Sequence, residues 1–120
     1  MANQMAEVSS ILQEWSGVKA RLEELFHERN HENTRELMQR GIDLFVQFLY
    51  FSNEKALQLD RSIPFIQFDL KPVNIEERFA FIKSRPSLFH SFRQLSELMV
   101  EQEKLFVKNN IIKKSSKPKA

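Results

Sequence analysis

Cysteine is absent from this chain of 120 residues, and glycine and proline are scarce, with two and four copies. Without cysteine, neither a disulfide framework nor a thiolate zinc site can form, which is compatible with a reducing compartment. The scarcity of glycine and proline indicates long regular elements, and eleven phenylalanines indicate a bulky core. These features favour a single all-helical domain, since a chain of this length buries enough surface to fold without cross-links.

Long apolar runs are also absent. The most apolar stretch, residues 42–51, is interrupted by Asp43 and Gln47 and is far shorter than the roughly 20 residues that a membrane-spanning helix needs. The opening residues, MANQMAEVSS, lack the basic and apolar regions of a secretory signal. We therefore expect a cytoplasmic protein without a membrane segment.

Acidic residues are missing from the last 13 positions, which contain five lysines: Lys108, Lys113, Lys114, Lys117 and Lys119. Removing these five from the 18 basic residues leaves 13 against 16 acids, so residues 1–107 carry a net charge of −3. We predict one domain over residues 1–112 and a disordered basic tail over residues 113–120. Weak nucleic-acid binding through the five lysines is an alternative function, although no aromatic residue lies among them to stack on bases.

A first helix of about 20 residues is predicted from an apolar seam with alternating spacings of three and four. The seam consists of Val8, Ile11, Trp15, Val18, Leu22 and Leu25. Such a seam packs equally well within one chain or between two, so the sequence leaves a homodimer open.

A second helix is predicted from Asn33 and Glu36, which have the spacing of a capping box and place its start at Thr34 and its end near Leu57. Polar residues on this helix form one narrow stripe: Glu36, Arg40, Asp43, Gln47 and Glu54. Because almost every other residue is then buried, we expect this helix to be the central element.

The next segment, residues 60–73, contains two prolines among its apolar residues. We predict an extended crossover that lays its phenylalanines over the helices. A short strand over residues 63–70 is the alternative, but a lone strand would leave its backbone groups without partners.

A short third helix is predicted from Asn74 and Glu77, which repeat the capping-box spacing. Its inward residues are Ile75, Phe79 and Ile82. Ser84 is placed to cap a fourth helix, with Pro86 in its first turn. A heptad seam with one polar lapse follows: Leu88, Phe92, Leu95, Met99, Gln102 and Phe106. The predicted fold is all-α, an antiparallel four-helix bundle with a long apolar crossover between helices 2 and 3.

Residues 27–31, HERNH, match the H-E-x-x-H motif in which two histidines on one helical face bind zinc and the glutamate polarises the bound water. If Asn33 caps the second helix, His31 lies in the turn before it, outside the helix that carries His27 and Glu28. The heptad register also directs His27 away from the core. We interpret the motif as a fortuitous surface pair, and a zinc hydrolase using His27, Glu28 and His31 is the alternative.

No third ligand completes the motif. Glu54 follows Asn53 as in zinc peptidases with a glutamate ligand, but the Ser-Asp pair expected after it is absent. Thr34 occupies the glycine position of the three-histidine version, and the register of the fourth helix directs His90 to solvent. We therefore predict no metal ligand, no cofactor and no catalytic residue.

Two smaller patterns have structural explanations. Ser87, His90 and Ser91 place hydroxyls near a base on one exposed helix face, but no acid is placed to orient the histidine. Both glycines fall within predicted helices, so there is no glycine-rich loop to bind a phosphate.

Aromatic residues provide the remaining functional signal. They cluster at Phe45, Phe48, Tyr50, Phe51, Phe65, Phe68, Phe79 and Phe81. Most of them must build the core, and any that reach the surface would mark a contact with a protein partner.

Two segments carry a resemblance to a known family. Residues 71–82, KPVNIEERFAFI, and 85–104, RPSLFHSFRQLSELMVEQEK, are similar to the YpoC-like family of small uncharacterised proteins from Gram-positive, spore-forming bacteria. The resemblance extends back through residues 41–55 and leaves HERNH outside it. It implies a cytoplasmic bacterial protein with no assigned activity and transfers no functional residue. Since the chain also lacks a catalytic constellation, we predict a non-enzymatic module that binds a protein partner.

Overall fold

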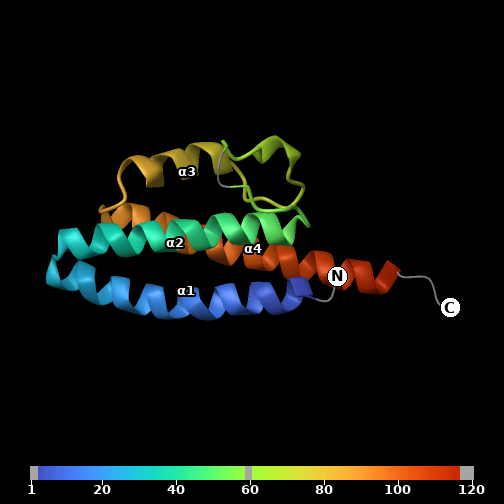
Figure 1. Cartoon of the computed structure of the whole chain (residues 1–120), viewed down its shortest axis with the longest axis horizontal. Helices are drawn as coiled ribbons and strands as arrows, with labels where there is room; N and C mark the ends of the chain where they lie inside the picture. Colours follow the sequence, from blue (N-terminus) through green and yellow to red (C-terminus); the bar gives the residue numbers. More distant parts are fainter. Residues whose placement is uncertain (1–2, 59–60, 117–120) are drawn as a thin grey trace.

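The computed structural model describes residues 3–58 and 61–116, and these residues contain four α-helices, one short 3-10 helix and no strand. The elements are α1 (Asn3–Glu28), α2 (His31–Ser52), the 3-10 helix η1 (Phe65–Gln67), α3 (Ile75–Ser84) and α4 (Phe89–Ser116). The prediction of an all-helical chain with four helices is thus confirmed for the described residues. The three long helices lie lengthwise beside one another, and α3 and the crossover lie on the side of α2 away from α1 (Figure 1).

Helix α1 presents one apolar face to α2 and α4. All six residues of the predicted seam are buried: Val8, Ile11, Trp15, Val18, Leu22 and Leu25. The helix has 26 residues rather than about 20, because its polar first turn continues the same helix before the seam begins.

Helix α2 is the central element, as its narrow polar stripe predicts. It contacts both α1 and α4, and half of its 22 residues are buried. Phe45 and Phe48 are completely inaccessible to solvent. Arg40 and Asp43 are exposed, and Gln47 is half-buried.

The turn between α1 and α2 consists of two residues, and Arg29 adopts a left-handed conformation with φ of 59°. The Arg29 N–H donates to the Phe26 carbonyl at 3.2 Å, and the Asn30 N–H donates to the Leu25 carbonyl at 3.0 Å. These two bonds satisfy the last carbonyls of α1 in the pattern of a Schellman motif.

The predicted cap of α2 at Asn33 is wrong. The side-chain oxygen of Asn30 accepts from the Asn33 N–H at 3.2 Å, so Asn30 is the cap and α2 begins at His31. Two asparagines three residues apart offer the same local signal, and the chain reversal at Arg29 selects the first of them.

We expect Arg29→Gly to raise the free energy of unfolding by about 1 kcal/mol, because glycine adopts a left-handed conformation without the steric strain of a side chain. Arg35→Gly is the matched control, since Arg35 is an exposed arginine within α2, where glycine lowers helix stability by about 1 kcal/mol. Urea unfolding followed by far-UV circular dichroism measures both changes. A loss of stability in Arg29→Gly would show that this turn is not strained.

A long crossover, residues 53–74, joins α2 to α3. Helix α2 ends at Ser52 rather than near Leu57. Two residues after this end, Glu54 takes a left-handed conformation with φ of 56°. Within the crossover Phe68 is buried and Phe65 is half-buried, whereas Ile66 is 87% exposed. Only part of this segment therefore covers the bundle. Among its described residues the alternative of a strand over residues 63–70 is not realised, since Phe65–Gln67 forms η1.

Two amide side chains fasten the crossover to the helices. Asn53 donates through Nδ2 to the carbonyls of Leu49 and Leu70, both at 2.8 Å, and its Oδ1 accepts from the Leu70 N–H at 2.8 Å. Gln102 of α4 donates through Nε2 to Ser52 Oγ at 2.6 Å and to the Leu70 carbonyl at 2.9 Å. The one polar residue of the α4 seam thus connects α4, α2 and the crossover.

Helix α3 buries Ile75, Phe79 and Ile82, as predicted. Its predicted capping box is wrong, because Asn74 precedes it in a left-handed conformation and makes no side-chain capping bond. Asparagine tolerates this conformation better than most residues.

The predicted start of α4 is wrong as well. Ser84 is the last residue of α3, and its hydroxyl donates to the Phe81 carbonyl at 2.9 Å instead of accepting from a backbone N–H of α4. Helix α4 begins at Phe89, so Pro86 lies in the turn before it. Leu88, which should begin the seam, is 43% exposed.

The rest of the α4 seam is buried: Phe92, Leu95, Met99, Gln102 and Phe106. The helix continues to Ser116, into the predicted basic tail, and its last turns extend beyond the ends of α1 and α2 (Figure 1). Residues 117–120 of that tail lie outside the described residues. None of the described helices is both long and apolar enough to cross a membrane.

The helices α1, α2 and α4 approach one another closely at Gly41. A Cβ atom added there would lie 2.8 Å from Trp15 Cζ3 and 3.0 Å from Leu95 Cδ2. Gly17 differs, because a Cβ added on that exposed side of α1 would meet nothing within 4 Å. Only Gly41 is therefore required by packing.

Candidate interaction surface

The structure divides HERNH between two helices. His27 and Glu28 end α1, and His31 is the first residue of α2 rather than a residue of the preceding turn. Both histidines are exposed. Because the zinc motif requires two histidines on one helical face, the spacing has no metal-binding meaning here. Within residues 3–58 and 61–116, no group of three or more histidine or acidic side chains is placed to hold a metal ion.

The Ser-His-Ser pattern near the start of α4 does not occupy one exposed face. Ser91 is completely buried, and its hydroxyl donates to the Arg85 carbonyl at 2.6 Å. His90 is exposed and packs edge-on against Phe81, with ring centroids 5.3 Å apart. The Ser91 hydroxyl therefore stabilises the turn between α3 and α4, and the prediction that it is exposed is wrong.

The aromatic residues singled out from the sequence do not form a surface patch. None of the eight is exposed: Phe45, Phe48, Tyr50, Phe51, Phe65, Phe68, Phe79 and Phe81. Among the described residues the exposed phenylalanine is Phe89, which is 54% exposed and packs on Phe26 and Phe92. The sequence did not indicate that Phe89 is the first residue of α4, because it predicted that this helix begins after Ser84.

A charged cluster joins α3 to α4. Arg78 donates two hydrogen bonds to the Glu101 carboxylate, at 2.9 and 2.7 Å, and one to the Gln94 side chain at 3.2 Å. It also donates to the Val73 carbonyl at 3.0 Å. The hydrogen bond from Arg78 is the main reason that the pKa of Glu101 lies below its ordinary value of 4.5.

This ion pair predicts a loss of stability in acid. Because the pKa of Glu101 is lower in the folded than in the unfolded chain, its contribution is complete above pH 4.5 and disappears as the pH falls through the lowered value. Since the Glu101 side chain is 39% exposed, we expect the effect to be no more than about 1 kcal/mol. Arg78→Met should make the free energy of unfolding fall less steeply as the pH is lowered below 4.5, whereas Arg21→Met, which removes an exposed pair with Glu24, should not. Urea unfolding at a series of pH values measures both. An unchanged pH dependence in Arg78→Met would contradict the assignment of the effect to Glu101.

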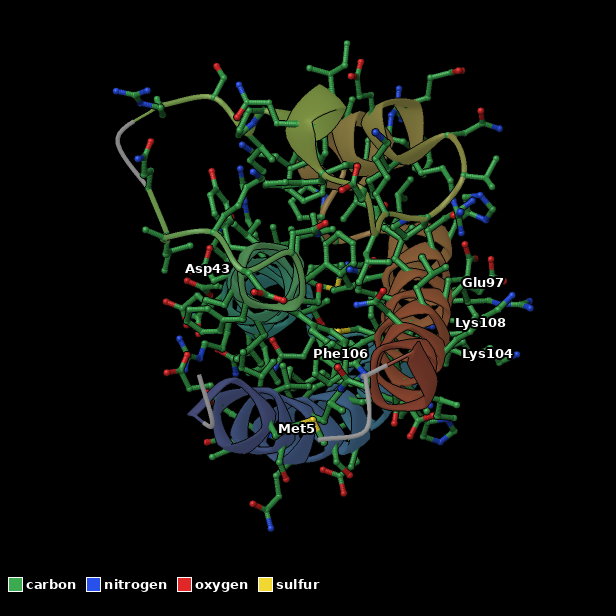
Figure 2. All side chains as sticks on the ribbon, turned by 90° about the vertical axis from the view of Figure 1, so that its right-hand side faces the viewer. Met5, Asp43, Glu97, Lys104, Phe106 and Lys108 are labelled. Atoms are coloured by element: carbon green, nitrogen blue, oxygen red, sulfur yellow. The ribbon has the colours of Figure 1, made fainter. Side chains whose placement is uncertain are left out.

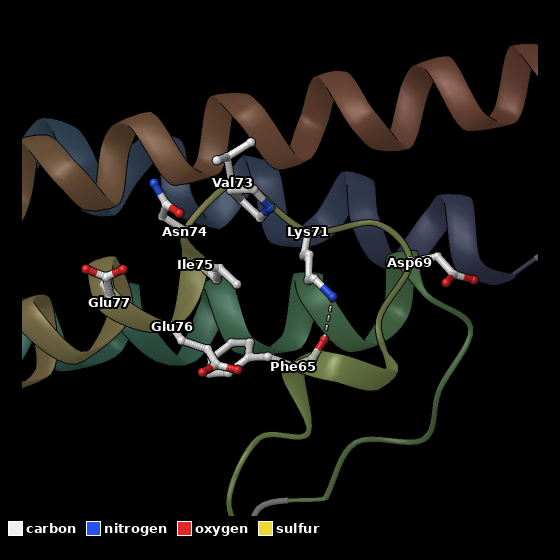
Figure 3. A pocket seen from close by; sticks show the side chains of 9 residues that line it. Phe65, Asp69, Lys71, Val73, Asn74, Ile75, Glu76 and Glu77 are labelled. Carbon is white, nitrogen blue, oxygen red and sulfur yellow. Dashed lines mark hydrogen bonds between the residues drawn. The ribbon is translucent and has the colours of Figure 1, made fainter.

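The crossover segment of residues 71–73 separates two hollows. The larger, of about 490 Å³, lies against the start of α3 (Figure 3) and is lined by Phe65, Asp69, Lys71, Pro72, Val73, Asn74, Ile75, Glu76 and Glu77. Lys71 points into this hollow, where its ammonium group donates to the carbonyls of Phe65 and Phe68, both at 3.0 Å. The ammonium group therefore binds the first residue of η1 and the residue that follows η1.

The smaller hollow, of about 280 Å³, lies between the crossover and α4. It is lined by Lys71, Pro72, Val73, Glu101, Lys104, Leu105 and Lys108. Val73 is 75% exposed, although it lies beside Leu105 in an apolar environment. This hollow is thus an open apolar groove with lysines at its rim, and we call it the Val73 groove.

The surface of α4 next to the groove also exposes apolar side chains. Val100, Val107 and Ile111 are 49%, 47% and 59% exposed. At 100° per residue they lie in one sector of the helix, which also contains Lys104 and Lys108 and, nearer the start of α4, the exposed Arg93 and Glu97. We call Val100, Lys104, Val107, Lys108 and Ile111 the α4 outer face. Figure 2 shows both lysines pointing away from the bundle, opposite in direction to the inward Phe106.

Residues 5–114 match the family model described as YpoC-like protein. The chain belongs to the YpoC-like family. The match is wider than the resemblance seen in the sequence and includes HERNH, so the prediction that this motif lies outside the family region is wrong.

A curated relative is the uncharacterized protein YpoC of Bacillus subtilis strain 168, which is 31% identical over 103 residues. This alignment covers 84% of the chain but 63% of the relative, so the chain spans less than two thirds of the relative's length. No solved structure matches the chain. Neither the family nor the relative is described by an activity.

Proposed function

We propose that this YpoC-like chain is a non-enzymatic protein-interaction module, built as an antiparallel four-helix bundle, that binds a protein partner through the α4 outer face and the Val73 groove. The observation that carries the proposal is the exposure of Val73 beside a groove lined by Pro72 and Leu105. Three further apolar side chains are exposed on α4 on the other side of Lys104 and Lys108 from the groove. Exposed apolar surface bordered by polar residues is characteristic of binding sites.

Site-specific photo-crosslinking in the full chain tests the proposal. A photoreactive p-benzoylphenylalanine replaces Val73 in one sample and Gln13, an exposed residue of α1, in the control. We expect a protease-sensitive adduct from native lysate at position 73 and none above background at position 13. Equal adduct formation at the two positions, or none at either, would exclude this surface as a protein-binding site.

A further inference from the structure

We infer that the partner segment bound at the α4 outer face is an acidic amphipathic helix. This inference rests on the proposed function of that face and adds the chemistry of the partner. Two independent features of the surface carry it, namely the two lysines along its edge and its helical spacing of apolar residues.

The charge of the face is opposite to that of the rest of the domain. Residues 1–107 carry a net charge of −3, yet Lys104 and Lys108 project from the outer face. Neither lysine takes part in any of the ion pairs formed among the described residues. Glu101 in the adjoining groove is bound at two points by Arg78, and Glu97, which lies in the same sector of α4 as the lysines, is 3.9 Å from the same guanidinium group. Lys104 also attracts Glu101, so the positive charge of the face is compensated in part.

Glu103 gives the face a direction. It is exposed about 100° around α4 from Lys104, on the edge away from the groove, and unlike Glu97 and Glu101 it takes part in none of the ion pairs formed among the described residues. A partner with carboxylates along one side would gain attraction at the lysine edge and avoid Glu103. The lysine edge is also the side that borders the Val73 groove.

The apolar residues fit a helix rather than another kind of segment. Val100, Val107 and Ile111 are spaced by seven and four, so they span about 16 Å, or three helical turns. A partner helix with apolar residues at matching positions covers such a stripe, and one large side chain fits the Val73 groove. No strand exists among the described residues, so strand addition has no edge to use. No aromatic side chain lies on the face to stack on nucleic-acid bases.

The test combines crosslinking from position 73 with charge reversal in the full chain. The variant Lys104→Glu/Lys108→Glu reverses the charge of this edge. Arg35→Glu/Arg61→Glu is the control, since both arginines are exposed outside α4, on α2 and in the crossover, and the change in net charge is the same. Lys104→Gln/Lys108→Gln is a milder version. Thermal unfolding confirms that each variant is folded, and mass spectrometry of the adduct identifies the crosslinked segment.

We expect the crosslinked segment to be rich in aspartate and glutamate, with apolar residues at helical spacing. Reversal of the two lysines should lower adduct yield about tenfold, neutralisation should lower it less, and the control should leave it unchanged. Raising salt from about 50 to about 500 mM should also lower the yield.

An adduct with a segment that lacks acidic residues, with a second copy of this chain or with nucleic acid would overturn the inference, as would a yield unaffected by the lysine reversal. Those results differ from the failure of the proposed function itself, in which position 73 gives no specific adduct at all.

Discussion

Gly41→Val is expected to lower the free energy of unfolding by about 3 kcal/mol, because overpacking a close contact forces side chains and backbone to move. Even the first added carbon would lie 2.8 Å from the ring of Trp15 and 3.0 Å from Leu95. Both neighbours are buried core residues on different helices, so neither can move without disturbing the packing of α1 or α4 on α2. Urea unfolding followed by far-UV circular dichroism measures the change.

Two alanine variants provide the control. Gly17→Ala should gain up to about 1 kcal/mol from higher helix propensity, since the added methyl group meets no neighbour. Gly41→Ala receives the same propensity gain, but the contact with Trp15 should make it less stable than Gly17→Ala by about 1 kcal/mol or more. Equal effects at the two glycines would show that the three helices can separate slightly at no cost.

Asn53→Ala is expected to destabilise the protein by about 2 kcal/mol, because it leaves the Leu70 N–H and two carbonyls without this partner in a half-buried position. The loss should concentrate in the crossover, whose attachment to α2 depends on this side chain. Hydrogen exchange of the Leu70 amide should accelerate, while amides in the middle of α2 should change less. Unchanged protection at Leu70 would mean that the rest of the crossover packing suffices to hold it.

Gln102→Leu is the informative comparison, because it also removes contacts to the crossover but should leave stability within about 1 kcal/mol of the original. The Gln102 Oε1 atom has no hydrogen-bond partner among the described residues, so part of the side chain is buried at a cost. After the change Ser52 still donates to the Phe48 carbonyl and Leu70 still accepts from Asn53. A loss similar to that of Asn53→Ala would show that the link between α4 and the crossover matters more than hydrogen-bond satisfaction.

The apolar periodicity of this chain predicts its helices well, because burial of a helical face depends on residues that are close in sequence. The seam from Val8 to Leu25 and the inward face of α3 are both buried as predicted. Helix ends are predicted less well. Asn30 and Asn33 offer equivalent caps, and only the left-handed turn at Arg29 decides between them.

The polar contacts that hold the crossover to α2 and α3 to α4 could not be predicted from sequence. Asn53 and Leu70 are 17 residues apart, and Arg78 and Glu101 are 23 apart, so neither pair has a local pattern. Ser91 is a further example, because its sequence position predicts an exposed hydroxyl, whereas the hydroxyl is buried and donates to the Arg85 carbonyl.

The candidate surface could be predicted from the sequence only in part. The spacing of Val100, Val107 and Ile111 is visible there, as is the density of lysines near them. Sequence alone does not show that these residues lie outside the bundle, because α4 carries a second apolar seam that could have been the buried or the exposed one. The packing of α1 and α2 against α4 determines that the seam from Phe92 to Phe106 is the buried one.

Trp15 is the single tryptophan of the chain, and its contact with Gly41 gives it a further use. It lies on α1, which is separated from the crossover by α2 (Figures 1 and 2). Its intrinsic fluorescence should therefore change when the long helices separate and stay unchanged when only the crossover detaches. Comparing indole emission with Leu70 hydrogen exchange in a single titration would distinguish peeling of this one segment from melting of the whole domain.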